Sequence, residues 1–152
     1  MYRSEYNRLI KWKLMESKKP LIIYGARQVG KTYLIKEFGK TEYRQMVYIN
    51  FERTKEMQGI FLQDLDPKRL ITAFELYAGI KITSEDTLIV LDEIQAAAQG
   101  LTSLKYFYEA SCKHNVIFYI STTNLIMCHC IGKFLYFMYH CIGTCSGRKK
   151  CL

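Results

Sequence analysis

Residues 25–32, Gly-Ala-Arg-Gln-Val-Gly-Lys-Thr, separate two segments of different periodicity. Residues 21–24, Leu-Ile-Ile-Tyr, precede them as a short apolar run with β-branched members, which is typical of a buried parallel strand. Residues 34–38 follow them and place apolar side chains on one face of a helix, which Gly39 is predicted to end. The sequence therefore predicts a strand, a glycine-bounded loop and a helix in direct succession.

The loop has the pattern Gly-x4-Gly-Lys-Thr, which is that of a P-loop, or Walker A motif. Its glycines allow a tight turn in which backbone N–H groups point at a polyphosphate, and the following helix adds the positive end of its dipole. Lys31 is expected to contact the β- and γ-phosphates, and the Thr32 hydroxyl to bind Mg²⁺. The predicted nucleotide-binding residues are Gly25, Ala26, Arg27, Gln28, Val29, Gly30, Lys31, Thr32 and Tyr33.

A second motif is needed, because the P-loop pattern fixes only four positions and also occurs by chance. Residues 87–91, Thr-Leu-Ile-Val-Leu, predict a strand buried on both faces, and Asp92 and Glu93 follow it. In this Walker B pattern Asp92 is expected to hold Mg²⁺, usually through water, and Glu93 to orient the attacking water. An acidic turn at a strand end would look the same. Together with the P-loop, however, the pair predicts a P-loop NTPase with Lys31 and Glu93 as catalytic residues.

The remaining segments predict an α/β fold in which helical layers enclose a central parallel sheet. A helix is expected from Pro67, after Asp66 as N-cap, to a stop at Gly79. Its predicted apolar face comprises Leu70, Ile71, Phe74, Leu76 and Tyr77. The other predicted elements are an amphipathic helix over 4–17 whose apolar stripe includes Leu14, strands over 46–51 and 115–120, a short helical segment over 55–62 and a helix over 101–110.

Composition and charge restrict the class of partner. The chain has 152 residues and a net charge of +8, but residues 1–109 carry 17 basic and 14 acidic side chains. The excess charge therefore lies near the C-terminal end, so the body of the domain does not predict nucleic-acid binding. The N-terminus has no secretory signal, which predicts a cytoplasmic protein with reduced cysteines and no membrane partner.

Four segments resemble AAA+-type ATP-binding proteins of bacteria and archaea: residues 25–32, 48–52 (Tyr-Ile-Asn-Phe-Glu), 91–95 (Leu-Asp-Glu-Ile-Gln) and 101–107. The resemblance covers about residues 1–115. It implies an AAA+ core, ATP as the nucleotide, Mg²⁺ as cofactor and self-association. Members of this family are usually longer and continue into a helical lid, which this sequence lacks together with a convincing arginine finger. A nucleotide-binding protein without turnover is therefore an alternative to an ATPase.

The sequence changes character after about residue 120. Acidic residues are absent beyond Glu109, and all six cysteines lie in 112–151. We therefore predict a P-loop ATPase domain over 1–120, with its core from about residue 20. The segment 121–152 is interpreted as a basic, cysteine-rich tail that is disordered or arises from a frame shift or premature end of translation.

This segment also allows other interpretations. The polar cluster at 121–124 occupies the place where many P-loop ATPases sense the γ-phosphate, although an ordinary turn explains it as well. Cysteines and histidines could bind zinc and support nucleic-acid binding. Residues 116–143 are apolar, but polar residues interrupt them, so a membrane span is a weak alternative. The candidate zinc ligands are Cys128, His129, Cys130, His140, Cys141 and Cys145.

Resequencing the coding DNA from about codon 110 onward tests the interpretation of the tail. If another forward reading frame continues with acidic residues and a helical lid, the residues after about 120 arise from a frame shift and the chain is the front part of a larger ATPase. If no other frame encodes such a continuation, the tail is genuine. Its cysteines and histidines then become candidates for metal analysis.

Overall fold

The structure is a computed structural model that describes residues 2–16, 19–25, 30–110 and 113–121. Helices and strands alternate along this part of the chain, as the sequence predicts. In chain order they are α1 (Tyr2–Lys13), β1 (Leu21–Gly25), α2 (Lys31–Glu42), β2 (Gln45–Asn50), the 3₁₀ helix η1 (Lys55–Leu62), α3 (Pro67–Ala78), β3 (Thr87–Asp92), the 3₁₀ turn η2 (Ile94–Ala96), α4 (Gly100–Glu109) and β4 (Asn115–Ser121).

The four strands form one parallel sheet in the order β1–β4–β3–β2. Because the strands are parallel, all of their carboxyl ends lie at the same edge of the sheet. At this edge Gly25 is paired with Ser121, and Asn50 is paired with Asp92. The strand that precedes the P-loop and the strand that ends in Asp92 are therefore separated by β4 alone.

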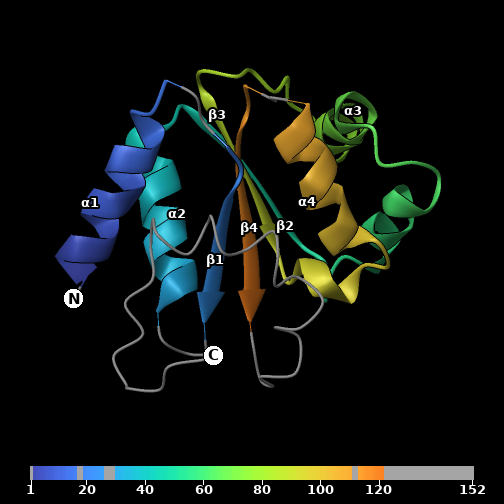
Figure 1. Cartoon of the computed structure of the whole chain (residues 1–152), viewed down its shortest axis with the longest axis horizontal. Helices are drawn as coiled ribbons and strands as arrows, with labels where there is room; N and C mark the ends of the chain where they lie inside the picture. Colours follow the sequence, from blue (N-terminus) through green and yellow to red (C-terminus); the bar gives the residue numbers. More distant parts are fainter. Residues whose placement is uncertain (1, 17–18, 26–29, 111–112, 122–152) are drawn as a thin grey trace.

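Helices cover both faces of the sheet and make a three-layer structure (Figure 1). One core joins α1 and α2 to the sheet and includes Leu88 and Val90 of β3. The other core joins α3, α4 and η1 to the opposite face and includes Ile89 and Leu91 of the same strand. Successive side chains of a strand point to opposite faces, so a strand between two helical layers is apolar throughout. The predicted three-layer α/β fold is confirmed.

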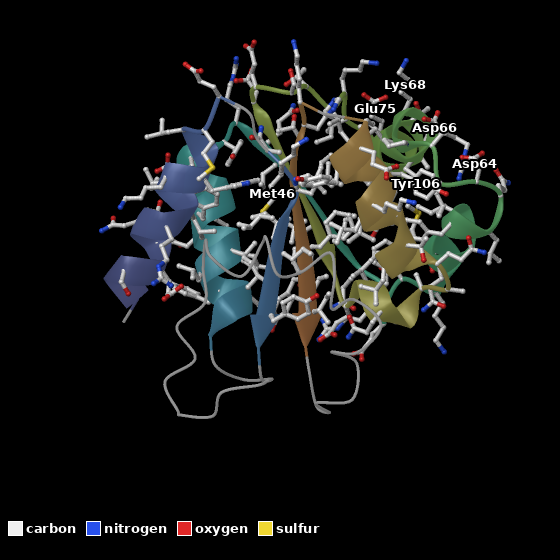
Figure 2. The ribbon with its side chains drawn as sticks, viewed as in Figure 1. Met46, Asp64, Asp66, Lys68, Glu75 and Tyr106 are labelled. Carbon is white, nitrogen blue, oxygen red and sulfur yellow. The ribbon has the colours of Figure 1, made fainter. Side chains whose placement is uncertain are left out.

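Gly39 does not end its helix, contrary to the prediction. α2 continues to Glu42, and Gly39 lies buried within it. A Cβ atom at this position would lie 2.4 Å from the Sδ atom of Met46 and 3.3 Å from a methyl group of Leu88. The Met46 side chain lies between α2 and the sheet (Figure 2). The glycine is therefore explained by the close approach of α2 to the sheet rather than by a cap.

The boundaries predicted for α3 are confirmed, but part of its predicted apolar face is wrong. Pro67 is the first residue of α3, and Gly79 ends it with φ of 67°. Leu70 and Phe74 are fully buried, whereas the side chain of Leu76 is 80% exposed. Leu76 follows Leu70 by six residues, which at 3.6 residues per turn rotates it about 120° from the buried face. Tyr77, in the last turn, is exposed as well.

The first helix is shorter at its end than predicted. α1 ends at Lys13 instead of residue 17, and Leu14, predicted to belong to its apolar stripe, lies beyond it and is exposed. Leu9 and Trp12 provide the buried contacts of this helix. The indole N–H of Trp12 donates a hydrogen bond of 2.9 Å to the carbonyl oxygen of Lys19. This bond ties α1 to the segment that leads into β1.

The predictions for residues 122–152 lie outside the described residues. They include the zinc ligands, most of the polar cluster at 121–124, most of the apolar run at 116–143 and the nature of the tail. Within the part of the chain that the structure describes, no helix is long and apolar enough to cross a membrane.

Replacement of Gly100 by alanine should destabilise the fold. A Cβ atom at Gly100 would lie 2.6 Å from the carbonyl oxygen of Ile94, so α4 and η2 could not both keep their positions. We expect Gly100→Ala to lower the free energy of unfolding by about 1–3 kcal/mol. Gly59→Ala is the matched control, because no heavy atom lies within 4 Å of a Cβ there. Urea unfolding curves measure both changes, and equal midpoints for the two variants would contradict the prediction.

Candidate nucleotide-binding site

The beginning of α2 forms one half of the candidate site. β1 ends at Gly25, and α2 begins at Lys31, directly after Gly30. Gly30 has φ of 79°, a left-handed conformation that glycine adopts without strain, and its carbonyl accepts the N–H of Leu34 at 3.0 Å. The first N–H groups of a helix have no acceptor within it, so they and the helix dipole favour an anion at this point.

Not all predicted P-loop residues can be placed. Residues 26–29, which are Ala26, Arg27, Gln28 and Val29, lie outside the described residues, as does the side chain of Lys31. Thr32 is half-buried in the first turn of α2, and Tyr33 is 65% exposed. The structure therefore places the end of β1 and the beginning of α2, which flank the loop, at the carboxyl edge of the sheet (Figure 1).

Asp92 forms the other half of the site. It is the last residue of β3 and is only 3% exposed. Because strand side chains alternate between faces, Asp92 points to the same face as Leu88 and Val90, which is the face that α2 covers. The predicted Walker B carboxylate and the N-terminus of α2 thus lie on the same side of the sheet, at its carboxyl edge.

Two residues of the neighbouring strand β2 bind the Asp92 carboxylate. The hydroxyl group of Tyr48 donates a hydrogen bond to its Oδ2 atom. The amide Nδ2 of Asn50 donates a second bond to the same oxygen at 2.9 Å. The other oxygen, Oδ1, is buried and has no hydrogen-bond partner among the described residues. Both donors therefore hold the same oxygen of the carboxylate, and the other oxygen has no donor among the described residues.

The protonation of this group of residues follows from burial. Burial raises the pKa of the Asp92 carboxyl above its usual value, although the hydrogen bonds from Tyr48 and Asn50 oppose this rise. Burial and the hydrogen bond to Asp92 raise the pKa of the Tyr48 hydroxyl, which therefore keeps its proton and acts as the donor. A nearby cation would favour the ionised form of Asp92.

Lys36 connects α2 to this network. Its Nζ atom lies 4.4 Å from the centroid of the Tyr48 ring, within the range of a cation–π interaction. Thr32 precedes Lys36 by four residues in the same helix, so the two lie on the same helical face. The face of α2 that carries Thr32 is thus turned toward β2, where Tyr48 contacts Asp92. Thr32 therefore shares the helical face from which Lys36 reaches Tyr48, the residue that donates to Asp92.

Glu93 is held differently from its neighbour. It is 7% exposed and has φ of 52° and ψ of 40°, a left-handed conformation that is strained for a residue with a side chain. The chain turns sharply here and enters η2. The side-chain amide of Gln95 donates a hydrogen bond to Oε2 of Glu93. The two adjacent carboxylates are therefore oriented by different elements, Asp92 by β2 and Glu93 by η2.

The residues present at this edge fit a magnesium ion. Mg²⁺ binds oxygen ligands, and proteins usually supply one or two carboxylates together with phosphate oxygens of the substrate. The buried Oδ1 of Asp92, which has no partner among the described residues, is the first candidate for such a ligand. The Thr32 hydroxyl is the second candidate oxygen.

A separate cleft of about 720 Å³ lies on the opposite side of the sheet, between α4 and the segment that leads into α3. Asp64, Asp66, Tyr106 and Glu109 line it, and the first three lie on the same side of the molecule in Figure 2. Asp64 is already bound by Arg69, whose Nε atom lies 2.7 Å from its Oδ1. The motif residues lie elsewhere, so we do not assign the chemistry to this cleft.

Sequence reasoning missed Tyr48, Asn50 and Gln95 as parts of the site. The signal for the first two is their position, because a residue at the carboxyl end of one parallel strand lies beside the end of the next. The register pairs Asn50 directly with Asp92, and Tyr48 points to the same face two residues earlier. Strand order is needed to read this signal, and the sequence alone does not give it.

The comparisons with known proteins identify the family. The model of a family described as AAA domain matches residues 17–133, which is most of the chain. No curated protein and no solved structure matches the chain. The matched residues contain the strand, the loop, the helix α2 and the two carboxylates described above. The chain therefore belongs to the AAA domain family, whose members are nucleotide-binding domains of the P-loop class.

Proposed function

We propose that the chain binds ATP together with Mg²⁺ and hydrolyses the bond between its β- and γ-phosphates. The observation that carries this proposal is the buried Oδ1 atom of Asp92, which lacks a partner among the described residues at the sheet edge where α2 begins. A buried carboxylate without full hydrogen bonding is costly, and a cation bound to a triphosphate would offset that cost.

Each residue has a defined part in this reaction. The backbone N–H groups at the start of α2 and the Lys31 ammonium group would bind the phosphates. Thr32 and Asp92 would hold Mg²⁺, which neutralises charge that develops on the phosphate oxygens. Glu93 would orient a water molecule whose oxygen forms a bond to the γ-phosphorus as the bond to the bridging oxygen breaks, and the proton that this water loses would pass to an oxygen of the released phosphate. The products are ADP and inorganic phosphate.

Nucleotide binding depends on Lys31 in this proposal, and turnover depends on Glu93. Lys31→Ala should weaken the binding of a fluorescent ATP analogue by about 10–100-fold, because charge-assisted bonds to phosphate are lost. Glu93→Gln should bind with near wild-type affinity but hydrolyse ATP about 100-fold more slowly. Lys40→Ala is the control for the first variant, since Lys40 is exposed on the far half of the same helix. Unchanged binding by Lys31→Ala would refute the proposed site.

The same experiment separates hydrolysis from binding alone. Suppose the wild-type chain binds ATP but hydrolyses it no faster than Glu93→Gln. The protein is then a nucleotide-binding protein without turnover, and only the hydrolytic part of the proposal is wrong.

Asp92→Asn should stabilise the fold at neutral pH while weakening metal-dependent binding. Burial raises the pKa of Asp92, so ionisation costs more in the folded than in the unfolded protein. Its contribution to stability is therefore present below its unfolded pKa and is lost as pH rises through the folded pKa. Asparagine avoids this ionisation and still offers an acceptor to Tyr48. We expect the stability of Asp92→Asn, relative to wild type, to increase from pH 4 to pH 7 in urea unfolding.

Asp64→Asn is a control for which we expect the opposite change of stability with pH. A hydrogen bond from Arg69 lowers the pKa of Asp64, so its stabilising contribution is present above the unfolded pKa and is lost as pH falls. Relative to wild type, Asp64→Asn should therefore become less stable as pH rises. If both variants changed in the same direction with pH, the electrostatic account of Asp92 would be wrong.

A further inference from the structure

Tyr48 is one of two residues that determine which oxygen of the Asp92 carboxylate has no hydrogen-bond donor among the described residues. Its hydroxyl group and the Asn50 amide both donate to Oδ2, and neither donates to Oδ1. A carboxylate with both donors on one oxygen cannot rotate without breaking these bonds. Oδ1, buried and without a partner among the described residues, is therefore kept in one direction.

The Tyr48 ring is itself fixed between two elements. It belongs to β2, where its neighbours Val47 and Ile49 are buried in the opposite core. Lys36 covers its ring from α2, with Nζ 4.4 Å from the centroid. One turn earlier on the same helical face lies Thr32, the other predicted Mg²⁺ ligand. The tyrosine thus lies between the helix that carries one ligand and the strand end that carries the other.

We propose that Tyr48 is a positioning residue for the metal: its hydroxyl holds Oδ2 of Asp92 so that Oδ1 faces Mg²⁺ bound with ATP. This inference rests on the proposed function, because it requires a Mg²⁺–nucleotide complex at this edge. Residues that orient a metal ligand through a hydrogen bond commonly change metal affinity by 10–100-fold when replaced. In this role Tyr48 acts on the metal through Asp92 and is not itself a ligand.

A purely structural role for Tyr48 makes a different prediction. If the hydroxyl only stabilised the sheet edge, its removal would lower stability or weaken nucleotide binding equally with and without metal. A positioning role lowers only the part of the affinity that depends on metal. The ratio of nucleotide dissociation constants without and with metal therefore separates the two roles.

The test uses the full 152-residue chain and a fluorescent ATP analogue, titrated once in EDTA and once in Mg²⁺. Tyr48→Phe keeps the ring beneath Lys36 and removes only the hydroxyl. We expect its dissociation constant in EDTA to stay within about 2-fold of wild type, whereas the ratio of EDTA to Mg²⁺ constants falls about 10-fold. The electron paramagnetic resonance spectrum of Mn²⁺ in the nucleotide complex should also change, because one ligand is less well oriented.

Tyr43→Phe is the matched control. Tyr43 is a buried tyrosine that also lies beneath a lysine, with Lys13 Nζ 4.9 Å from its ring centroid. Its hydroxyl has no hydrogen-bond partner among the described residues and does not bind Asp92. The ratio for Tyr43→Phe should equal that of wild type. Thermal melting of the three proteins checks that each is folded.

The outcomes distinguish this inference from the proposed function. If Tyr48→Phe has the same ratio of EDTA to Mg²⁺ dissociation constants as wild type, the positioning role is wrong. It is also wrong if the variant loses affinity equally in EDTA and in Mg²⁺. Either result leaves the proposed function intact. If the wild-type chain itself binds no nucleotide, or binds it equally in EDTA and Mg²⁺, the proposed Mg²⁺–ATP site is wrong. The role of Tyr48 is then wrong with it.

Discussion

β3 carries aliphatic side chains to both faces of the sheet, so it can leave water only when helices cover both faces. Leu88 and Val90 pack beneath α1 and α2, while Ile89 and Leu91 pack beneath α3 and α4. Each such side chain contributes about 1.5–3 kcal/mol on burial. Asp92, at the end of this strand, is buried as well, and its burial raises the pKa of its carboxyl.

A carboxylate in this position is expensive for the folded chain. The donors on β2 satisfy one of its oxygens, but a buried polar atom without a partner costs about 1–3 kcal/mol. An apolar residue at the end of β3 would avoid that cost. In the proposed site a bound cation would supply the missing interaction, so any ligand that brings one should stabilise the folded state. Under that proposal Asp92 is a binding residue whose cost is offset when the site is filled.

The sequence was sufficient for features that depend on local pattern and insufficient for those that depend on strand order. The strands, the helix after the P-loop and the stop at Gly79 follow from periodicity and glycine chemistry. Tyr48 and Asn50 could not be assigned, because their role exists only when β2 lies beside β3 in the observed register. Gly39 was misassigned for a related reason. A glycine near a helix end indicates either a cap or a close approach, and only the packing against Met46 decides between them.

Asp92 and Glu93 are adjacent in the sequence but are bound by different elements, because the chain turns at Glu93, which has a left-handed conformation. Asp92 is bound by β2 on the α2 face, whereas Glu93 is bound by Gln95 of η2. η2 in turn packs against Gly100, the first residue of α4. The left-handed conformation of Glu93 costs about 1–3 kcal/mol. The contacts of Asp92 with β2 and of Glu93 with η2 hold the chain in this conformation. A nucleotide that engages both carboxylates would connect the two helical layers, so movement of either layer would alter the relative position of the proposed metal ligand and the proposed water-orienting residue.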